Sequence, residues 1–379
     1  MLFQIKCSMQ KELYSTCLYI NFSQLHSNIQ IIKENIKSSS IIAMIKANAY
    51  GCGDILIAKK LSKLGVNYFG VADFEEGIRL RDNGIKGPIM VMNTTVDSVE
   101  KIIEYNLEPV VNKKEILLSI IKTNTKASST LIPIHIKINT GMNRWGVNPS
   151  DLSSIIKLIQ SSSKKIVIRS IYSHLSSAEN RHHDRFTDVQ INKFLKIKKL
   201  FDTNFQYHIH THILNSFGFK YFSSKINQFD HLRIGIALYT GFKNSNLKSI
   251  LELRCKIAQI RELNINDTVG YSREFVVKKK MQIAIIPFGY ADGLQRSWGN
   301  GTLKFYFKGH LLPTVGNISM DSCAIDITSL YNTNMINDGD EVIYFGKERS
   351  IWNLASELNT IPYEILATLS KRIKRIYYD

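Results

Sequence analysis

The sequence predicts an α/β protein, in which an N-terminal (β/α)8 barrel is followed by a C-terminal mostly-β domain. Two observations support this. Short apolar runs alternate with helix-patterned segments from about residue 41 to residue 246, and after about residue 247 strand-like alternation replaces the helical period. The predicted domains are therefore residues 12–246, the barrel, and residues 247–379, the β domain. Residues 1–11 are expected to pack with the β domain as an extra strand.

Eight apolar runs are the candidate strands of the barrel. In order along the chain, they are Ile41–Ile45, Tyr68–Ala72, Ile89–Met92, Glu108–Val111, Ile132–Ile138, Ile166–Tyr172, Tyr207–Ile213 and Leu232–Leu238. Amphipathic segments such as GDILIAKKLSKLG and FEEGIRLRDNG separate them, and several end at Gly or Asn, where a helix C-cap belongs. Eight strand–helix units in about 200 residues are typical of a TIM barrel, which carries catalytic groups at the C-terminal ends of its strands.

The second domain is predicted from six segments of alternating pattern, followed by a helical tail from Trp352 onward. These segments are LELRCKIAQI, DTVGYSREFVV, MQIAIIPFGYA, GTLKFYFKGHLL, DSCAIDIT and DEVIYFG.

Composition and charge exclude several classes of protein. With 44% hydrophobic residues in 379, the chain can bury a large core, so it is neither disordered nor fibrous. The net charge of +17 is spread along the chain, and no basic run is longer than Lys278–Lys280. This pattern favours solvated basic faces over a nucleic-acid site, so no nucleic-acid partner is predicted.

Cysteine usage and hydropathy indicate the compartment. The five cysteines are odd in number and contain no C-x-x-C pair, which argues against a disulfide framework or a structural zinc site. Lys6, Lys11 and Glu12 interrupt the N-terminal segment, and no run of about 18 apolar residues occurs. A cytoplasmic protein without an export signal or membrane partner is expected.

Lys46 ends the first predicted strand and is the first candidate for chemistry. A lysine in this position is desolvated, which lowers its pKa and suits it to Schiff-base formation or proton abstraction. A lysine that snorkels from a strand end would look the same in sequence. The neighbouring Tyr50, Gly51 and Gly53 favour a binding site, because a phosphate needs a hydroxyl donor and close approach of the backbone.

A second signal lies at the other end of the barrel sequence. Asn215 and Ser216 follow the seventh predicted strand, and Arg233-Ile-Gly235-Ile236 closes the eighth. Loops after strands 7 and 8 commonly bind phosphate in barrels of this type. Together with Lys46, they predict pyridoxal 5'-phosphate (PLP) as the cofactor, with its aldehyde on the lysine.

The sequence resembles the alanine racemase family over nearly its whole length. Nine motifs occur in the family's order: KANAYG (46–51), KINTGMNRWG (137–146), SHLSSAE (173–179), NS (215–216), RIGIALY (233–239), VGYS (269–272), GYADG (289–293), SMD (319–321) and PYEIL (362–366). The resemblance implies a PLP-dependent isomerase that interconverts L- and D-alanine by two bases and supplies D-alanine for peptidoglycan. It also implies a homodimer, in which the β domain of one subunit completes the site of the other.

The resemblance assigns a role to each matching residue. Lys46 carries PLP and acts as one catalytic base, and Tyr271 is the other. Further residues implied to bind the cofactor are Tyr50, Ser216, Tyr363 and the backbone of Gly235 and Ile236 at the phosphate, Arg233 at the ring nitrogen and His174 beside it. Arg144 and the main chain of Met320 are implied to bind the phenolic oxygen and the substrate carboxylate, with Asp321 nearby. Lys137 matches the position that is carbamylated in many members of the family to hold that arginine.

Four positions depart from the family pattern: Cys52, Asn139, Trp145 and Ser319 replace the usual histidine, aspartate, leucine and cysteine. Asn139 and Trp145 bear on the geometry around Arg144. Since the catalytic positions match, the departures concern rate and specificity.

Several other readings stay open. A racemase of broader specificity, or one for serine, would share these motifs, and a non-catalytic PLP carrier would share the barrel but lack the β domain. The run His208-Ile-His210-Thr-His212 places three histidines on one face of a strand, as in a barrel metal hydrolase. No carboxylate partner is evident on nearby strand ends, so no metal site is expected.

Overall fold

The computed structural model describes residues 14–36, 38–124, 131–222, 224–225, 229–331, 333 and 335–379. The expectation for residues 1–11 lies outside these residues. The chain divides into two compact units. The barrel unit comprises Ile29–Ala49 and Asp54–Ala237, and the β unit comprises the chain up to Asn28, Tyr50–Gly53 and Leu238–Asp379. Our boundaries at residues 12, 246 and 247 remain a prediction.

The barrel unit contains one parallel eight-stranded sheet in the order β8-β7-β6-β5-β4-β3-β2-β9, which confirms the predicted TIM barrel. Its strands are β2 (Ser40–Met44), β3 (Tyr68–Val71), β4 (Ile89–Val91), β5 (Glu108–Val111), β6 (Ile132–Lys137), β7 (Ile166–Tyr172), β8 (His210–His212) and β9 (His231–Ile234). All eight predicted runs contain a strand. The last two are shorter than predicted, since β8 begins at His210 and β9 ends at Ile234, just before a helical turn.

The barrel closes at a seam between β8 and β9. Two backbone hydrogen bonds link these segments, from Asp230 N to Thr211 O (2.9 Å) and from Arg233 N to Leu214 O (3.1 Å). By contrast, β2 pairs with β9 over four consecutive residue pairs. Among the described residues, the seam therefore lacks the continuous ladder that joins β2 to β9.

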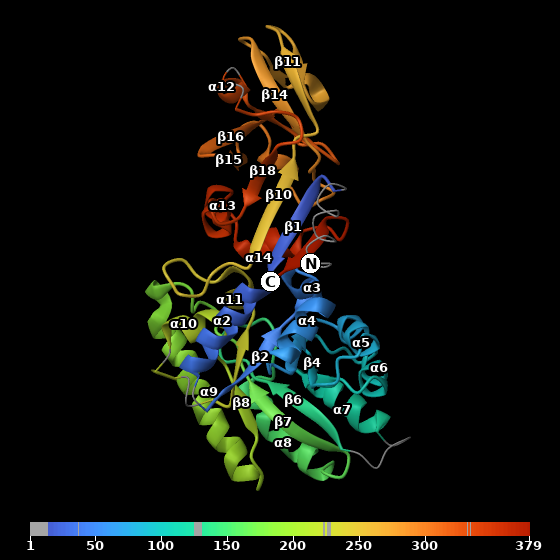
Figure 1. Ribbon diagram of the computed structural model, residues 1–379. Helices are drawn as coiled ribbons and strands as arrows, with labels where there is room; N and C mark the ends of the chain where they lie inside the picture. Colours follow the sequence, from blue (N-terminus) through green and yellow to red (C-terminus); the bar gives the residue numbers. More distant parts are fainter. Residues whose placement is uncertain are drawn as a thin grey trace. The chain divides into compact units, whose positions relative to one another are not determined.

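Helices cover the outside of the barrel strands (Figure 1). Those of the barrel unit are α4 (Asp54–Lys63), α5 (Phe74–Asp82), α6 (Val99–Glu104), α7 (Lys114–Thr123), α8 (Leu152–Ser161), α9 (Asp184–Asn204) and α10 (Ser216–Tyr221). In α8, Leu152, Ile155, Ile156 and Ile159 are buried. Their spacing places them on one stripe of the helix, so burial of that stripe explains why this segment is helical. Helices α2 (Phe22–Asn35), α3 (Lys46–Tyr50) and α11 (Ile236–Thr240) contain residues of both units.

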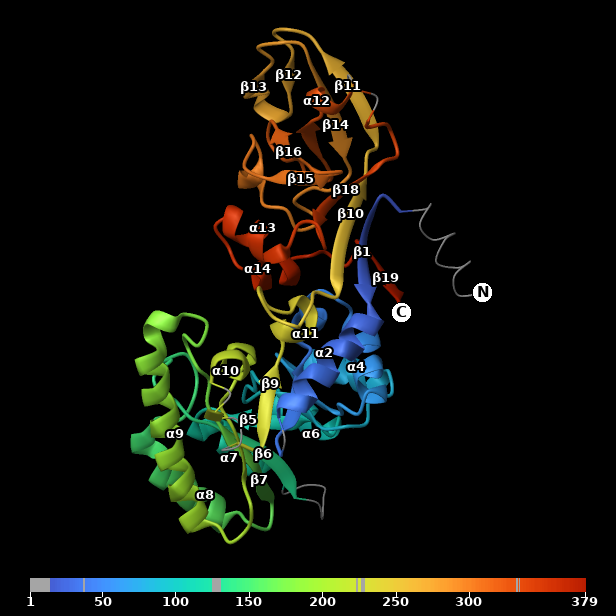
Figure 2. The same ribbon diagram turned by 60° about the vertical axis from the view of Figure 1, so that its left-hand side comes forward.

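The β unit is built on a nine-stranded sheet, which confirms the mostly-β character predicted after the barrel (Figure 2). Its order is β11-β14-β17-β16-β15-β18-β10-β1-β19. The strands are β1 (Thr16–Asn21), β10 (Leu251–Lys256), β11 (Gln259–Leu263), β14 (Met281–Ile286), β15 (Lys304–Phe307), β16 (His310–Val315), β17 (Cys323–Asp326), β18 (Glu341–Phe345) and β19 (Lys374–Tyr378). Strand β1 pairs with β10 antiparallel and with β19 parallel.

The C-terminal tail differs in part from the prediction. Two helices, α13 (Ile351–Glu357) and α14 (Pro362–Ala367), follow the last predicted strand, but the chain then forms β19 instead of continuing as helix. The ladder partners of β19 lie in β1, more than 350 residues earlier in the sequence, and local periodicity carries no information about such a pairing. Smaller elements of the β unit are β12 (Thr268–Val269), β13 (Phe275–Val276) and α12 (Thr328–Tyr331).

In the part of the chain that the structure describes, no helix combines the length and the apolar composition needed to cross a membrane.

Candidate active site

Lys46 directly follows the barrel strand β2 and begins an unusual left-handed turn. Ala47, Asn48, Ala49 and Tyr50 have φ angles of 51°, 55°, 51° and 55°. For residues with a Cβ atom this conformation costs about 1–2 kcal/mol each. Backbone strain of this kind persists only where the surroundings enforce it, and it concentrates at functional sites.

Specific hydrogen bonds hold this turn. Ala49 N donates to Ile45 O (2.8 Å), and Ala47 N donates to the Glu76 carboxylate (2.6 Å). The other oxygen of Glu76 accepts from Ala72 N at the end of β3 (2.7 Å). Glu76 therefore ties the lysine's turn to the neighbouring strand end, a role that our sequence analysis missed. Its position just after a barrel strand was the available signal.

Four basic side chains of the barrel unit lie at this end of the strands: Lys46, Lys137, Arg144 and Arg233. Desolvation and the positive charges of Arg144 and Arg233 lower the pKa of Lys46, while Glu76 opposes the change. Desolvation and the charges of Arg144, Arg233 and Lys46 lower the pKa of the buried Lys137 to about 7. The structure thus brings together predicted residues from three different strand ends as one electropositive site.

Arg233 is the most buried of these cations, and its two terminal nitrogens are held by the protein. Nη1 donates to His212 Nδ1 (2.6 Å), and Nη2 donates to Ser173 O (2.6 Å) and to His174 Nδ1 (3.1 Å). Within the described residues its Nε–H has no protein acceptor. Burial lowers the pKa of Arg233 to about 10, so the guanidinium still carries its charge at neutral pH.

His174 and His212 are both neutral in this arrangement. Burial, followed by the charge of Arg233, lowers their pKa values well below the ordinary histidine value. A neutral imidazole has one unprotonated nitrogen that can accept a hydrogen bond. The Arg233 guanidinium needs such an acceptor in both His212 and His174.

From His212, a chain of hydrogen bonds runs through the barrel interior. His212 Nε2 lies 2.9 Å from Ser170 Oγ, which lies 2.7 Å from His135 Nδ1, and His135 Nε2 lies 2.9 Å from Glu108 Oε2. Since Arg233 can only donate, each group in turn must accept on one side and donate on the other, which orients the whole chain toward the Glu108 carboxylate.

Glu108 at the end of this chain is ionised. Burial by itself would raise the pKa of Glu108, but hydrogen bonding to His135, the charge of Arg169 and the Tyr68 hydroxyl lower it. Tyr68 OH donates to Glu108 Oε2 at 2.8 Å, and Arg169 lies 3.0 Å from Oε1. We call this set, Glu108, His135, Ser170 and His212, the polar layer. Sequence reasoning did not identify it.

Ser216 links the loops that follow β8 and β9. Its buried Oγ accepts from Gly235 N (3.1 Å) and from Ala237 N (3.4 Å). Asn215 caps α10 by accepting from Gly218 N (2.9 Å). The predicted phosphate-binding loops are therefore adjacent in the barrel unit.

Tyr50 and Tyr363 lie together in the β unit. Their ring centroids are 6.0 Å apart, and Tyr50 also packs on Tyr239 at 5.0 Å. Burial raises the pKa of Tyr50, so its hydroxyl remains a donor at physiological pH. Gly51 has a φ of 77°, and a Cβ there would lie 2.3 Å from Leu366 O, so glycine is required beside Tyr50.

Tyr271, Met320 and Asp321 are exposed on the β unit. The exposed fractions of Tyr271 and Met320 are 72% and 53%. Arg372 donates to Asp321 (2.6 Å), and Ala291 N donates to Met320 O (2.9 Å), which fixes the backbone there.

Of the four positions that depart from the family pattern, Asn139 has a clear local role. Asn139 accepts from Gly141 N (3.1 Å) and Asn143 N (3.2 Å), so its amide shapes the loop that carries Arg144. Trp145 is 47% exposed. Cys52 is fully buried, and burial raises the pKa of its thiol, so it does not act as a nucleophile.

The three histidines of the 208–212 run do not share one environment. His212 lies in the polar layer, whereas His208 and His210 lie near Asp230, so the interpretation of three ligands on one face is wrong. Our expectation that no carboxylate is close is also wrong. Asp230 precedes β9, and the hydrogen bonds at the seam between β8 and β9 bring it beside the two histidines.

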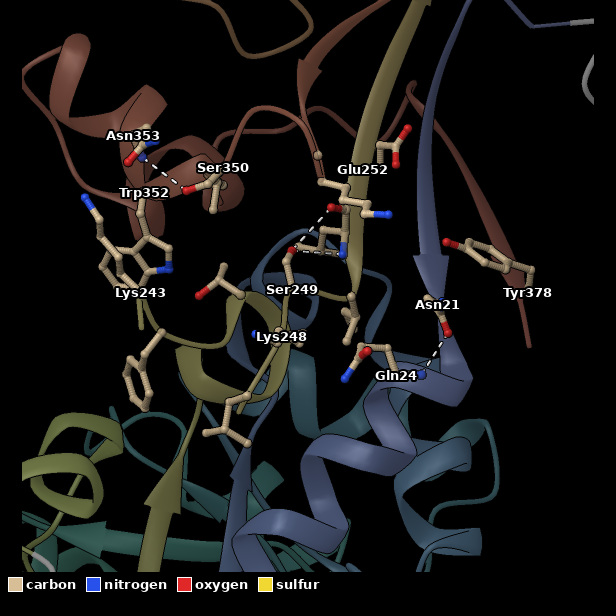
Figure 3. Close-up of a pocket in the computed structure, with 18 residues that line it drawn as sticks. Asn21, Gln24, Lys243, Lys248, Ser249, Glu252, Ser350, Trp352, Asn353 and Tyr378 are labelled. Atoms are coloured by element: carbon tan, nitrogen blue, oxygen red, sulfur yellow. Dashed lines mark hydrogen bonds between the residues drawn. The ribbon is translucent and has the colours of Figure 1, made fainter. Parts of the chain in front are cut away.

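A pocket of about 610 Å³ lies elsewhere in the β unit (Figure 3). Its labelled lining residues include Asn21, Lys243, Ser249, Glu252 and Trp352. None of the site residues predicted from the sequence lines this pocket.

Comparisons with known proteins agree on one family. Residues 20–242 match the family described as alanine racemase, N-terminal domain, and residues 250–377 match alanine racemase, C-terminal domain. An alanine racemase of Clostridium tetani is 36% identical over 97% of both chains, and one of Aquifex aeolicus is 36% identical over 95% of this chain and 98% of its own.

Solved structures lead to the same family. An alanine racemase of Clostridium difficile superposes with a TM-score of 0.86 at 30% identity, covering 96% of both chains. The alanine racemase of Bartonella henselae, described with covalently bound pyridoxal phosphate, superposes with a TM-score of 0.86 at 29% identity, covering 96% of this chain and 100% of its own. The chain belongs to the alanine racemase family.

Proposed function

We propose that this protein is a PLP-dependent alanine racemase, an isomerase that interconverts L-alanine and D-alanine. The observation that carries the proposal is the electropositive site at the end of the barrel strands. Arg144 and Arg233 lie close enough to both lysines there to lower the pKa values of Lys46 and Lys137 by charge repulsion. An anionic cofactor and an anionic substrate carboxylate would both offset this repulsion.

The residues present fit PLP. Lys46 supplies a primary amine for the aldehyde, and its lowered pKa increases the fraction of uncharged amine. The Nε–H of Arg233 is a free donor for the ring nitrogen, with His174 beside it. The phosphate would be bound by the hydroxyls of Tyr50, Ser216 and Tyr363 and by the backbone of Gly235 and Ile236.

Bound PLP withdraws electron density from the substrate Cα and so acidifies the α-proton. Arg233 is a donor that keeps its proton, which limits charge transfer into the ring and favours simple proton exchange over side reactions. Arg144 would bind the phenolic oxygen and the main chain of Met320 the substrate carboxylate, with Asp321 nearby. Lys46 and Tyr271 would act as bases on opposite faces, Lys46 toward D-alanine and Tyr271 toward L-alanine.

An assay with purified protein and PLP tests the reaction. Racemisation of L-alanine should be readily measured, and serine should react about 100-fold more slowly, because a small pocket discriminates weakly against one hydroxyl. Comparable kcat/KM for lysine or arginine would favour a broad-specificity racemase. Cofactor binding without turnover of any amino acid would favour the PLP carrier.

Lys137 is proposed to be carbamylated, since its buried amine is well suited to react with CO2. Only the neutral amine attacks CO2, and a lysine at its ordinary pKa is neutral in roughly one molecule in three thousand at pH 7. With its pKa lowered to about 7, Lys137 is about half neutral there. The carbamate's negative charge would then offset Arg144 and Arg233.

The fraction of carbamate should therefore rise as the pH increases through about 7 and fall in acid, where the amine is protonated. Nuclear magnetic resonance of protein equilibrated with ¹³C-labelled CO2 measures this directly. Lys137→Ala should remove the signal and weaken substrate binding, whereas Lys113→Ala should do neither. A carbamate signal that is unchanged in Lys137→Ala would contradict the assignment.

We further propose that the enzyme is a cytoplasmic homodimer that supplies D-alanine for peptidoglycan, as the family resemblance implies. The exposure of Tyr271 and Met320 supports a partner contact at this surface. Mixing a Lys46→Ala chain with a Tyr271→Phe chain should then create one intact site in each mixed dimer. At random 1:1 mixing about a quarter of the sites are intact, so up to about a quarter of wild-type activity should return. No recovery, with subunit exchange verified, would argue against composite sites.

A further inference from the structure

His208, His210 and Asp230 form a cluster at the N-terminal ends of β8 and β9, away from the strand ends that carry Arg233 and Ser216 (β8 in Figure 1, β9 in Figure 2). Each residue offers one ligand atom, and these atoms lie within 4.8 Å of one another. The proposed racemase reaction uses none of the three residues.

The carboxylate of Asp230 is oriented by its neighbours. Its Oδ2 accepts from Thr211 N (2.7 Å) and from Thr211 Oγ1 (2.8 Å). This fixes the side chain so that Oδ1 faces the histidines, with His208 Nε2 at 2.7 Å. In metal sites, a carboxylate ligand is commonly held by hydrogen bonds to one oxygen while it presents the other oxygen to the ion.

His210 adds a nitrogen that lacks a partner. Its Nδ1 is buried and forms no hydrogen bond within the described residues, and it lies 3.8 Å from Asp230 Oδ1. That distance is too long for a hydrogen bond. A cation placed between the two atoms would satisfy the buried nitrogen.

We propose that His208, His210 and Asp230 bind a transition-metal ion, Zn²⁺ in the first instance, with water as the fourth ligand. Two imidazole nitrogens and one carboxylate oxygen form a donor set that zinc commonly accepts. Tetrahedral ligands with bonds of about 2.1 Å are about 3.4 Å apart. The separations of 2.7 and 3.8 Å from Asp230 Oδ1 bracket this value, so small side-chain adjustments suffice.

Such an ion would stabilise the seam of the barrel. The described seam carries two backbone hydrogen bonds, and β8 is only three residues long. The ligands come from both sides of the seam, so the metal would link the two segments directly. Because the site lies at the N-terminal ends of the strands, its role is structural and separate from the chemistry at the C-terminal ends.

Zinc binding to the holoenzyme, prepared without a histidine tag, tests this proposal. After equilibration in buffered Zn²⁺, elemental analysis should find one zinc per chain. His208→Ala and Asp230→Asn should each weaken zinc binding by at least about 100-fold. Losing a ligand costs more affinity than losing a group that only hydrogen-bonds to a ligand, which typically costs about 10–100-fold. Asp230→Asn keeps an acceptor for Thr211. His182→Ala, which changes an exposed histidine on η2 (Arg181–His183), is the matched control and should bind like wild type.

Hydrogen exchange gives a second readout. Zn²⁺ should slow amide exchange in peptides that cover β8 and β9 of the wild type, but not of His208→Ala. Equal melting temperatures of the variants and wild type in chelator verify that they fold. The proposal is overturned if no stoichiometric zinc binds, if binding survives both ligand substitutions, or if His182→Ala weakens it equally.

Discussion

Replacing Lys46 by alanine should lower racemase activity by at least about 10⁴-fold. The variant loses a base, which alone contributes up to about 10⁴-fold, and also the amine that would bind the cofactor covalently. Borohydride reduction of the wild-type holoenzyme should make that bond permanent, and peptide mapping should find the cofactor on Lys46. The exposed Lys63 of α4 provides the control, since Lys63→Ala should retain both activity and labelling. A labelled peptide that lacks Lys46 would show that the assignment is wrong.

Tyr271→Phe should affect the two enantiomers unequally. Racemisation must remove the α-proton from one face and deliver a proton to the other, so two bases on opposite faces each act first on one enantiomer. Without the phenolic oxygen, α-proton exchange from L-alanine should fall by about 10²–10⁴-fold, while exchange from D-alanine, which starts at Lys46, should be much less affected.

Single-turnover exchange in deuterium oxide measures both directions separately. Because Tyr271 is 72% exposed, the change to Phe should leave folding and cofactor binding intact, and cofactor absorbance verifies this. Tyr331→Phe, at another exposed tyrosine, is the matched control. Equal loss in both directions, or no loss, would contradict the two-base assignment.

Much of the fold could be predicted because it depends on how apolar residues repeat locally along the sequence. The buried parallel strands form short apolar runs, and the amphipathic helices between them repeat with a helical spacing, so the count of eight follows from the sequence. Strand β19 could not be predicted in this way. Its pairing with β1 depends on contacts between distant parts of the chain.

The site was predicted where motifs mark it and missed where tertiary contacts create it. The left-handed conformation of Ala47 and Ala49 contradicts their local preference and persists through hydrogen bonds such as that from Ala47 N to the Glu76 carboxylate. Asp230 lies beside His208 because the chain closes the barrel at the seam between β8 and β9. The alternative that placed His212 on one face with His208 and His210 rested on alternation along an extended chain, which does not reveal that β8 begins only at His210.

The polar layer restricts how this sequence can diverge. An apolar interior position such as Ile42 can change to valine at a small cost, because its neighbours lose only contacts. Ser170 is different, since its hydroxyl lies between His135 and His212. Ser170→Ala would leave a ring nitrogen on each side without its partner, inside a barrel that water does not fill.

Substitutions in this layer are therefore coupled to one another. A change at Glu108 alters which ring nitrogen of His135 carries a proton. That proton position determines whether the Ser170 hydroxyl donates or accepts, and so whether His212 Nδ1 is free to accept from Arg233. Single replacements should be poorly tolerated, whereas a concerted exchange of several members could preserve the orientation of every donor. Divergent relatives should accordingly retain or replace this layer as a set.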